Sequence, residues 1–257
     1  MMKKTAAYLL TTAIILGTAC AKEKPVTIST ENVKTLIPEQ TVAKNLPLEK
    51  AAAETAPKLK SNNIVIGYKD FPKDEEGKEI WVKKVKTGKP DVTVVEDADL
   101  KTHVLNLKSD EASYYYQKEV ENIDLDSHGV VSWKWKVSQH PKGGDVRKGR
   151  TDDQAIQVLL AFEGKYIISY IWDPAAPVGY TKDSSIPFLV AQKVIVLQSG
   201  EDKLDEWFEI RRDVKADFKK LYGKDAPELK GVAIQINSQH TDSKCESFLS
   251  PISFERK

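Results

Sequence analysis

The sequence is poor in cysteine, and this limits how the fold is stabilised. Of its 257 residues, only Cys20 and Cys245 are cysteines. If Cys20 is modified or removed during export, Cys245 has no partner, so we expect a fold that is stable without disulfides. Cys245 is either a reactive thiol or, as we favour, a small and partly buried hydrophobic residue.

The sequence also lacks an excess of charge of either sign. Lysine and arginine number 39 and aspartate and glutamate 38, a formal net charge of +1. Such a chain has no global field that draws it to nucleic acid, so we expect no nucleic-acid partner. The four histidines are scattered without the spacing of zinc ligands, and the common catalytic and nucleotide-binding motifs are missing. The sequence therefore predicts neither a metal site nor a cofactor.

Long apolar runs are absent except near the N-terminus. There Lys3 and Lys4 precede an uncharged, mostly apolar stretch at residues 5–19, which small residues follow. This pattern predicts a secretory signal peptide at residues 1–21, because the stretch is too short for a stable spanning helix.

The end of this signal peptide allows two interpretations. The residues LGTAC resemble the cleavage box of bacterial lipoproteins with Cys20 as the lipidated residue, although the leucine lies four residues before the cysteine instead of three. The residues ACA also fit ordinary signal cleavage, which would discard Cys20. We expect the first outcome, an exported protein held on a membrane of the cell envelope by a lipid anchor on Cys20 and facing the periplasm or the cell exterior. The second outcome would give a soluble periplasmic or secreted protein.

Residues 22–62 have the composition of a tether. They contain no aromatic side chain but four of the twelve prolines. Without large side chains they cannot bury enough surface to offset the entropy of the chain, so we expect a flexible segment. It would connect the anchor to a single domain at residues 63–257.

The pattern of this domain has a period of two. The residues VVSWKWKV place Val131, Trp133, Trp135 and Val137 on one face of a predicted strand. About eight to ten such runs, separated by turn residues, predict an all-β fold, mainly an antiparallel β-sandwich of the jelly-roll or galactose-binding-like kind. One or two short helices are expected, the clearest at residues 213–223, with an aspartate as N-cap and a glycine at its end.

Two adjacent acids, Asp152 and Asp153, precede a predicted buried strand at residues 155–162. If that strand extends back through the pair, the two side chains point to opposite faces. They could not then act together as a general acid and base, which must flank one bond. Asp153 would share its face with Gln157, so Asp153 is the better candidate for a ligand contact.

Polar and aromatic side chains on the predicted strands suggest a ligand-binding face. In EWFEIRR, the tryptophan, the second glutamate and the first arginine alternate with apolar residues. Aromatic planes stack on sugar rings and polar groups bind their hydroxyls, so such a face suits a carbohydrate. The alternative is a set of ordinary cross-strand ion pairs on a solvated sheet. The predicted ligand-binding residues are Asp153, Gln157, Trp172, Trp207, Arg211 and Asn237.

The chain resembles a bacterial family known as domain of unknown function 3047 (DUF3047), from about residue 64 to residue 254. Its aspartate pair, its Tyr-x-Trp element at Tyr170 and Trp172, and its Arg-Asp-Val helix start at residues 212–214 match the family pattern. The resemblance implies an exported β-sandwich domain and supplies no activity. The motifs that carry it are VSWKWKV, PKGGDVRKGRTDDQAIQVLLAFE, ISYIWDPAAPVG, EWFEIRRDVKADFKKLYG, GVAIQINSQHT and ISF.

The chain departs from this family at its C-terminal motif. Family members usually carry an Asp-rich stretch ending in Asn-Thr, whereas this chain has INSQHT. Asn237 and Gln239 stand where acids are expected, and His240 where asparagine is expected. Neutral amides can bind by hydrogen bonds but cannot transfer protons. If the family acids are catalytic, this chain has lost them.

Three functions therefore stay open from the sequence. We favour a non-catalytic envelope protein that binds a carbohydrate or another polar ligand. The second hypothesis is a hydrolase or lyase acting on envelope or extracellular glycans, with Arg211 stabilising negative charge. The third is a structural or assembly partner in the envelope. The carboxylates available to the second hypothesis are Asp152, Asp153, Asp173 and Glu209.

Overall fold

A computed structural model describes residues 63–256 of the chain. The predicted signal peptide, the tether at residues 22–62 and the lipidation site Cys20 lie outside the described residues and stay predictions. Within the described part of the chain, no helix combines the length and the hydropathy needed to cross a membrane.

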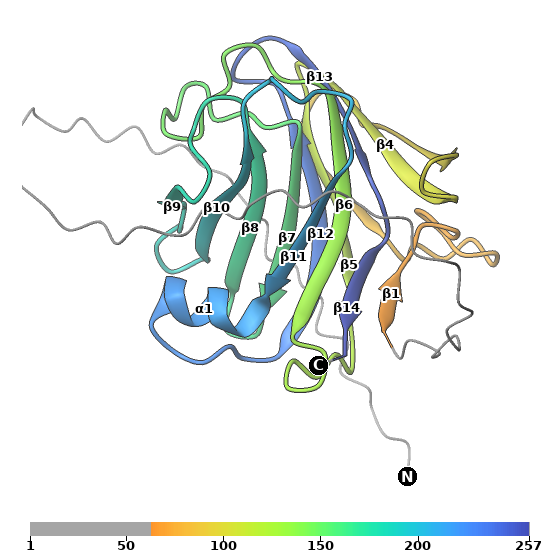
Figure 1. The fold of residues 1–257 in the computed structure, drawn as a ribbon, viewed down its shortest axis with the longest axis vertical. Coiled ribbons are helices and arrows are strands. Elements are labelled where there is room, and N and C mark those ends of the chain that lie inside the picture. The colour runs from red at the N-terminus through yellow and green to blue at the C-terminus, as the bar shows by residue number, and fades with distance from the viewer. Residues whose placement is uncertain (1–62, 257) are drawn as a thin grey trace, which may run out of the picture. The chain divides into compact units, whose positions relative to one another are not determined.

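Two seven-stranded sheets form the two layers of the domain (Figure 1). Every strand pairing is antiparallel except that between β8 and β10, which is parallel. In spatial order, the first sheet contains β1 (Ile64–Ile66), β14 (Ile252–Glu255), β6 (Val130–Gln139), β13 (Lys244–Leu249), β4 (Thr102–Asp110) and β3 (Asp91–Asp97), with β11 (Phe208–Asp213) also paired to β6. The second sheet contains β2 (Val82–Thr87), β5 (Ser113–Glu119), β12 (Leu229–Asn237), β7 (Ile156–Phe162), β8 (Tyr166–Asp173), β10 (Ala191–Ser199) and β9 (Thr181–Asp183).

The hydrophobic core lies between the two sheets. The alternating side chains of β6 are buried as the sequence predicts, while the residues between them are half-buried. The rings of Trp133 and Tyr170 lie 5.5 Å apart, and those of Trp135 and Trp172 lie 6.4 Å apart, so aromatic side chains join the layers. The predicted β-sandwich is confirmed, because a sheet with one apolar face must bury that face against a second layer.

The single helix of the described residues, α1 (Val214–Tyr222), also matches its prediction. The Asp213 carboxylate accepts a hydrogen bond from the backbone N–H of Ala216 at 3.0 Å, which caps the first turn. Gly223 ends the helix with a φ of 70°, a conformation that favours glycine. Phe218 packs against Phe162 with ring centroids 4.9 Å apart, so the helix closes one end of the sandwich.

The structure contains more strands than the eight to ten that the pattern predicts. The additional strands are short or highly charged: β1 and β9 have three residues each, and β2 has the sequence VKKVKT. They lie at the sheet edges, where short length and lysine side chains discourage pairing with other chains. Such strands lack the apolar alternation on which a sequence prediction depends.

Candidate functional site

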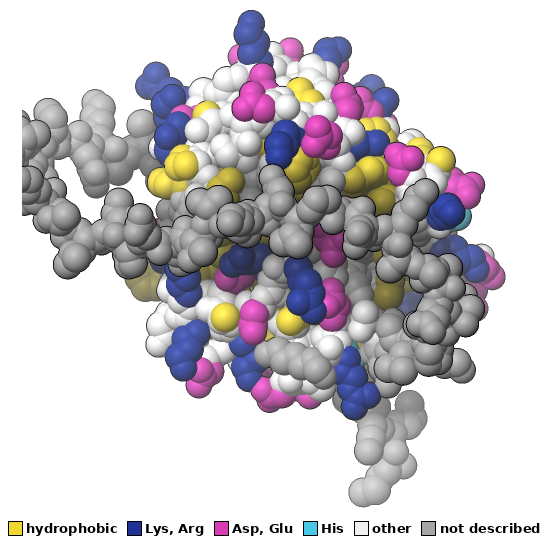
Figure 2. All heavy atoms as spheres, in the orientation of Figure 1, with side chains coloured by type: hydrophobic (Ala, Val, Ile, Leu, Met, Phe, Trp, Pro, Cys, Tyr) yellow, Lys and Arg dark blue, Asp and Glu magenta, His cyan; other side chains and the backbone are white. Residues whose placement is uncertain are grey.

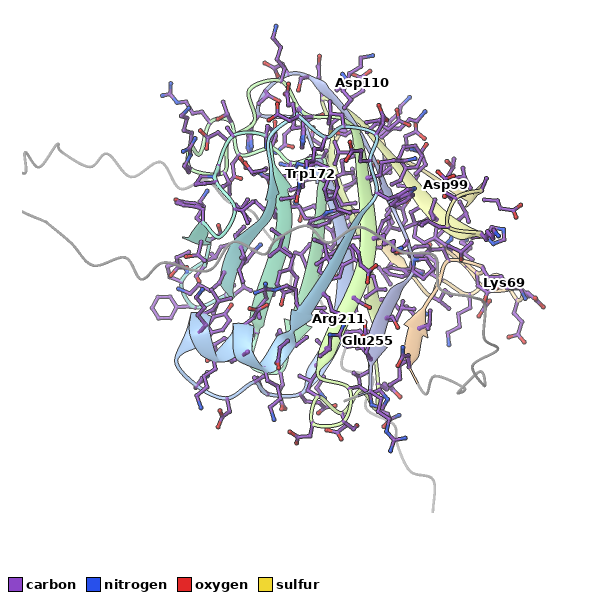
Figure 3. The ribbon with its side chains drawn as sticks, in the orientation of Figure 1. Lys69, Asp99, Asp110, Trp172, Arg211 and Glu255 are labelled. Atoms are coloured by element: carbon purple, nitrogen blue, oxygen red, sulfur yellow. The ribbon has the colours of Figure 1, made fainter. Side chains whose placement is uncertain are left out.

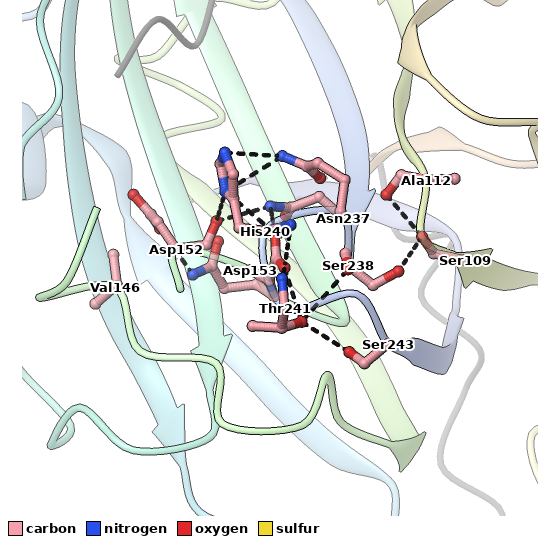
Figure 4. Close-up of polar contacts among 12 residues, drawn as sticks. Ser109, Ala112, Val146, Asp152, Asp153, Asn237, Ser238, His240, Thr241 and Ser243 are labelled. Carbon is pink, nitrogen blue, oxygen red and sulfur yellow. Dashed lines mark hydrogen bonds and ion pairs between the residues drawn. The ribbon is translucent and has the colours of Figure 1, made fainter. Parts of the chain in front are cut away.

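Asp153 lies at the centre of a buried polar network in the loop before β7 (Figure 4). Its Oδ1 accepts a hydrogen bond from Asn237 Nδ2 at 2.7 Å. Its Oδ2 accepts three more, from the backbone N–H groups of His240 and Thr241 at 2.8 Å each and from the Thr241 hydroxyl at 2.9 Å. The carboxylate therefore joins this loop to the turn after β12, and its acceptor capacity is used by the protein itself.

Asp152 takes a separate set of partners. Its carboxylate accepts from Lys182 Nζ at 2.6 Å and from Gln154 Nε2 at 2.9 Å. Because β7 begins at Ile156, the predicted strand does not extend back through the aspartates, and strand alternation is not what separates them. The two carboxylates diverge because each satisfies a different group of donors.

Three of the six predicted ligand-binding residues meet in one place. Gln157 Nε2 donates to Asn237 Oδ1 at 2.9 Å, and Asn237 in turn donates to Asp153. All three side chains are buried. They form a continuous band from the outer face of the second sheet to the Asp153 network.

The other three predicted residues lie elsewhere, and two of them, Trp172 and Arg211, are labelled in Figure 3. Trp172 is buried in the core, where its indole N–H donates to the carbonyl of Gly200 at 3.1 Å. Trp207 stacks against the ammonium of Lys136, 4.9 Å from the ring centroid. Arg211 Nε donates to Glu255 at 2.8 Å, an exposed ion pair across strands of the first sheet. The structure does not bring these three side chains to the Asp153 network.

The remaining candidate carboxylates are also occupied. Asp173 accepts hydrogen bonds from the backbone N–H groups of Val146, Ala175 and Ala176 at 2.6 to 2.9 Å. Burial raises the pKa of Asp173, and these hydrogen bonds counteract the shift. Glu209 lies on the first sheet, 3.6 Å from Lys134 Nζ. Asp173 lies near Asp152, because Gln154 Nε2 donates to Asp152 Oδ1 at 2.9 Å and lies 3.5 Å from Asp173 Oδ2, whereas Glu209 is on the other sheet.

A groove crosses the outer face of the second sheet over the neighbouring strands β5, β12, β7 and β8. Its cavity volume is about 50 Å³. Its floor is apolar and consists of Leu159, Ala161, Ile167 and Ala233, with Val190 as a wall. Exposed or half-buried side chains form the rim: Gln117, Lys118, Glu119, Lys165 and Lys230. We call this feature the outer groove.

A row of amide side chains adjoins the floor of the outer groove. Ala233 pairs with Leu159, and two residues further along β12, on the same face, Gln235 pairs with Tyr115 on one side and Gln157 on the other. Gln235 is only 1% exposed, and its Oε1 has no hydrogen-bond partner. A buried acceptor without a donor is costly, and this oxygen lies beneath the surface rather than in the lining of the outer groove.

The sequence pattern alone does not single out Tyr115, Gln117 and Gln235 as neighbours on one face. Their signal was present in the alternation of SYYYQKE and VAIQI, which places them on the face opposite the core residues. The alternation does not specify that β5 pairs with β12 and that β12 pairs with β7. Only these pairings place Gln235 between Tyr115 and Gln157, and Gln117 beside Ala233.

Charges of both signs are interspersed over the visible face of the molecule (Figure 2). Around the outer groove the signs are also mixed, and Lys230 pairs with Glu228 at 2.5 Å. In the described part of the chain, no group of three or more histidine, cysteine, aspartate or glutamate side chains is placed to hold a metal ion.

The fold and the groove define a β-sandwich with a shallow, mainly apolar depression on the outer face of one sheet. The chain belongs to the family described as protein of unknown function (DUF3047), whose profile matches residues 80–253. This match confirms the family that the sequence motifs indicate. None of the curated proteins matches the sequence.

Several solved structures are similar in shape. The xyloglucanase domain of NopAA from Sinorhizobium fredii, in complex with cellobiose, has 13% identity and a TM-score of 0.44, and the alignment covers 69% of this chain and 93% of that one. A family 11 carbohydrate-binding module from Clostridium thermocellum, in complex with a mixed-linked tetrasaccharide, has 10% identity and a TM-score of 0.39, with 76% and 96% covered. The function of this chain is therefore argued from its own residues.

Proposed function

We propose that this protein is a non-catalytic glycan-binding β-sandwich whose ligand lies along the outer groove. The observation that carries this proposal is the outer groove itself, in which an apolar floor of Leu159, Ala161 and Ala233 lies beside the half-buried carboxamide of Gln117. A hydroxyl group of a bound sugar would form hydrogen bonds with this carboxamide.

The composition of the groove suits a pyranose chain. A sugar ring has apolar C–H faces and polar edges, so it needs a flat apolar surface together with a few placed hydrogen-bonding groups. Leu159, Ala161 and Ala233 supply the apolar surface, and the carboxamide of Gln117 supplies donors and an acceptor. Because the surrounding charges are mixed in sign, we propose a neutral glycan as the ligand.

The carboxylates support binding rather than hydrolysis. Glycosidases use two carboxyl groups that flank the scissile bond at a separation of about 5 to 9.5 Å. Among the described residues that line the outer groove, Glu119 is the one carboxylate. The acids that the sequence suggests for catalysis, including Asp153 and Asp173, are occupied by hydrogen bonds within the protein.

The proposal is tested with Gln117→Leu. This substitution removes the carboxamide from the rim of the groove at nearly constant volume, and because Gln117 is only half-buried the urea midpoint should change little. Affinity for the bound glycan should fall by on the order of tenfold, the equivalent of about 1.4 kcal/mol. The matched control is Gln192→Leu on the same face, because Gln192 Nε2 already donates to Ser169 Oγ at 2.9 Å. The control should lose stability and keep its affinity.

The probes are hexasaccharides of equal length and different charge. Titration calorimetry with cellohexaose, mannohexaose and hexagalacturonate should give binding to at least one neutral chain and weaker binding to the acidic one. If none of the three binds to the intact wild-type protein, the proposed function is wrong. If Gln117→Leu binds as tightly as the wild type, the groove is not the site.

We further propose that the protein is exported and anchored through a lipid on Cys20, as its N-terminal sequence predicts. Labelling of the full chain with a radioactive fatty acid should tag the wild type and leave Cys20→Ala untagged. Export without labelling would instead support ordinary signal cleavage.

A further inference from the structure

A rigid turn projects an aromatic side chain into solvent beside the outer groove. The turn lies between Ile186 and Val190, whose backbones exchange two hydrogen bonds of 2.8 and 3.0 Å. Its base is fixed as well, since Ser185 Oγ accepts from the backbone N–H of Gln192 at 3.0 Å. The tip consists of Pro187, Phe188 and Leu189. We call it the 186–190 turn.

Neither packing nor backbone preference explains Phe188 at this tip. Its side chain is 102% exposed, so it gains none of the stabilisation that burial of a phenylalanine provides. Its φ of 62° lies in the left-handed region, which is unfavourable for a residue other than glycine. A bulky apolar residue in such a position is typical of a surface that acts on a ligand or a partner.

The turn is continuous with the outer groove. Val190 forms a wall of the groove and packs in the same cluster as Leu159 and Ile167. Phe188 precedes Val190 by two residues, so a chain that lies in the groove and extends past this wall meets the phenyl ring. Aromatic rings beside polar grooves provide a flat surface for the C–H face of a sugar.

From this geometry we infer that Phe188 is an extended subsite of the outer groove, where its ring stacks on one pyranose unit of a glycan longer than the groove itself. The inference rests on the proposed function. The charges at the base of the turn favour a sugar over an anionic membrane surface. Lys182 is paired with Asp152 and Lys193 with Asp183, so these cations are already neutralised by neighbouring carboxylates.

The experiment compares Phe188→Ala with Phe188→Trp, using calorimetry with a disaccharide and a hexasaccharide of the neutral glycan that binds. Phe188→Ala should weaken hexasaccharide binding by about five- to tenfold and leave disaccharide binding unchanged, while Phe188→Trp should retain or improve it. The matched control is Val178→Ala, because Val178 is also exposed and apolar but lies outside the turn. This control should bind as the wild type does.

The outcomes separate this inference from the proposed function. If the wild type binds no glycan, the proposed function fails and the subsite fails with it. If the wild type binds but Phe188→Ala retains full affinity for the hexasaccharide, only the subsite is wrong. A second measurement is sedimentation of the protein with vesicles of phosphatidylethanolamine and phosphatidylglycerol. If Phe188→Ala no longer sediments with these vesicles but still binds the glycan, the inference is also overturned, because the ring would then act on lipid.

Discussion

Replacing Asp153 by asparagine should destabilise the domain strongly although the shape of the side chain is kept. An amide has one acceptor, whereas the carboxylate accepts hydrogen bonds at both oxygens. If the amide oxygen faces the backbone N–H groups of His240 and Thr241, its NH₂ group is turned toward the donor Nδ2 of Asn237. The opposite orientation leaves three donors without an acceptor.

The expected loss follows from these contacts. Hydrogen bonds to a charged group contribute about 1.5 to 3 kcal/mol each, and an unpaired buried donor costs about 1 to 3 kcal/mol. Asp153→Asn leaves at least one buried donor unpaired and removes the charge. It should therefore lower the free energy of unfolding by about 3 to 5 kcal/mol. Urea unfolding followed by tryptophan fluorescence measures this loss.

The neighbouring Asp152→Asn is the matched control. Asp152 is partly exposed, and its partner Lys182 also donates to the carbonyl of Val146 at 2.8 Å. The control should therefore lose only about 1 kcal/mol. Equal losses in the two variants would refute the view that Asp153 is the structural centre of the loop network. A stable Asp153→Asn protein that has lost an activity on a glycan would restore the catalytic hypothesis.

Three further outcomes are expected. Burial lowers the pKa of His140 to about 4, so stability should fall by up to about 3 kcal/mol as pH drops from 6.5 to 4, and urea titrations of His140→Gln should show a flatter profile. Gly144→Ala should lower the melting temperature, because a Cβ there would lie 2.6 Å from the backbone oxygen of Asp153. Burial raises the pKa of the Cys245 thiol, so Ellman's reagent should react with Cys20→Ala protein only after unfolding.

The sequence predicts the core of this fold well, because burial leaves a periodic trace. Trp133 and Trp135 alternate with lysines on β6, and the aspartate and glycine that delimit α1 act through local geometry. The edge strand β2 has no such periodic pattern. Lysine side chains keep an edge strand soluble, and in β2 they interrupt the alternation of apolar residues.

The candidate site is harder to predict because its members come from strands that are distant in sequence. Asp153, Gln157 and Asn237 are polar residues beside buried strands, and the structure brings them together. Residue type alone places Trp172 in the same predicted set, but its side chain points inward from its strand and is buried in the core. The importance of Gln235 depends on which strands flank β12, and alternation alone does not specify neighbours.

The parallel pairing of β8 with β10 requires the chain to leave one end of the second sheet and re-enter at the other. Residues 174–190 make that return, and the 186–190 turn is part of it. The connection can therefore change its length or its tip residues while the strands around the amide row keep their register. Under the proposed function, exchange of this single connection would change the surface beside the outer groove on a constant scaffold.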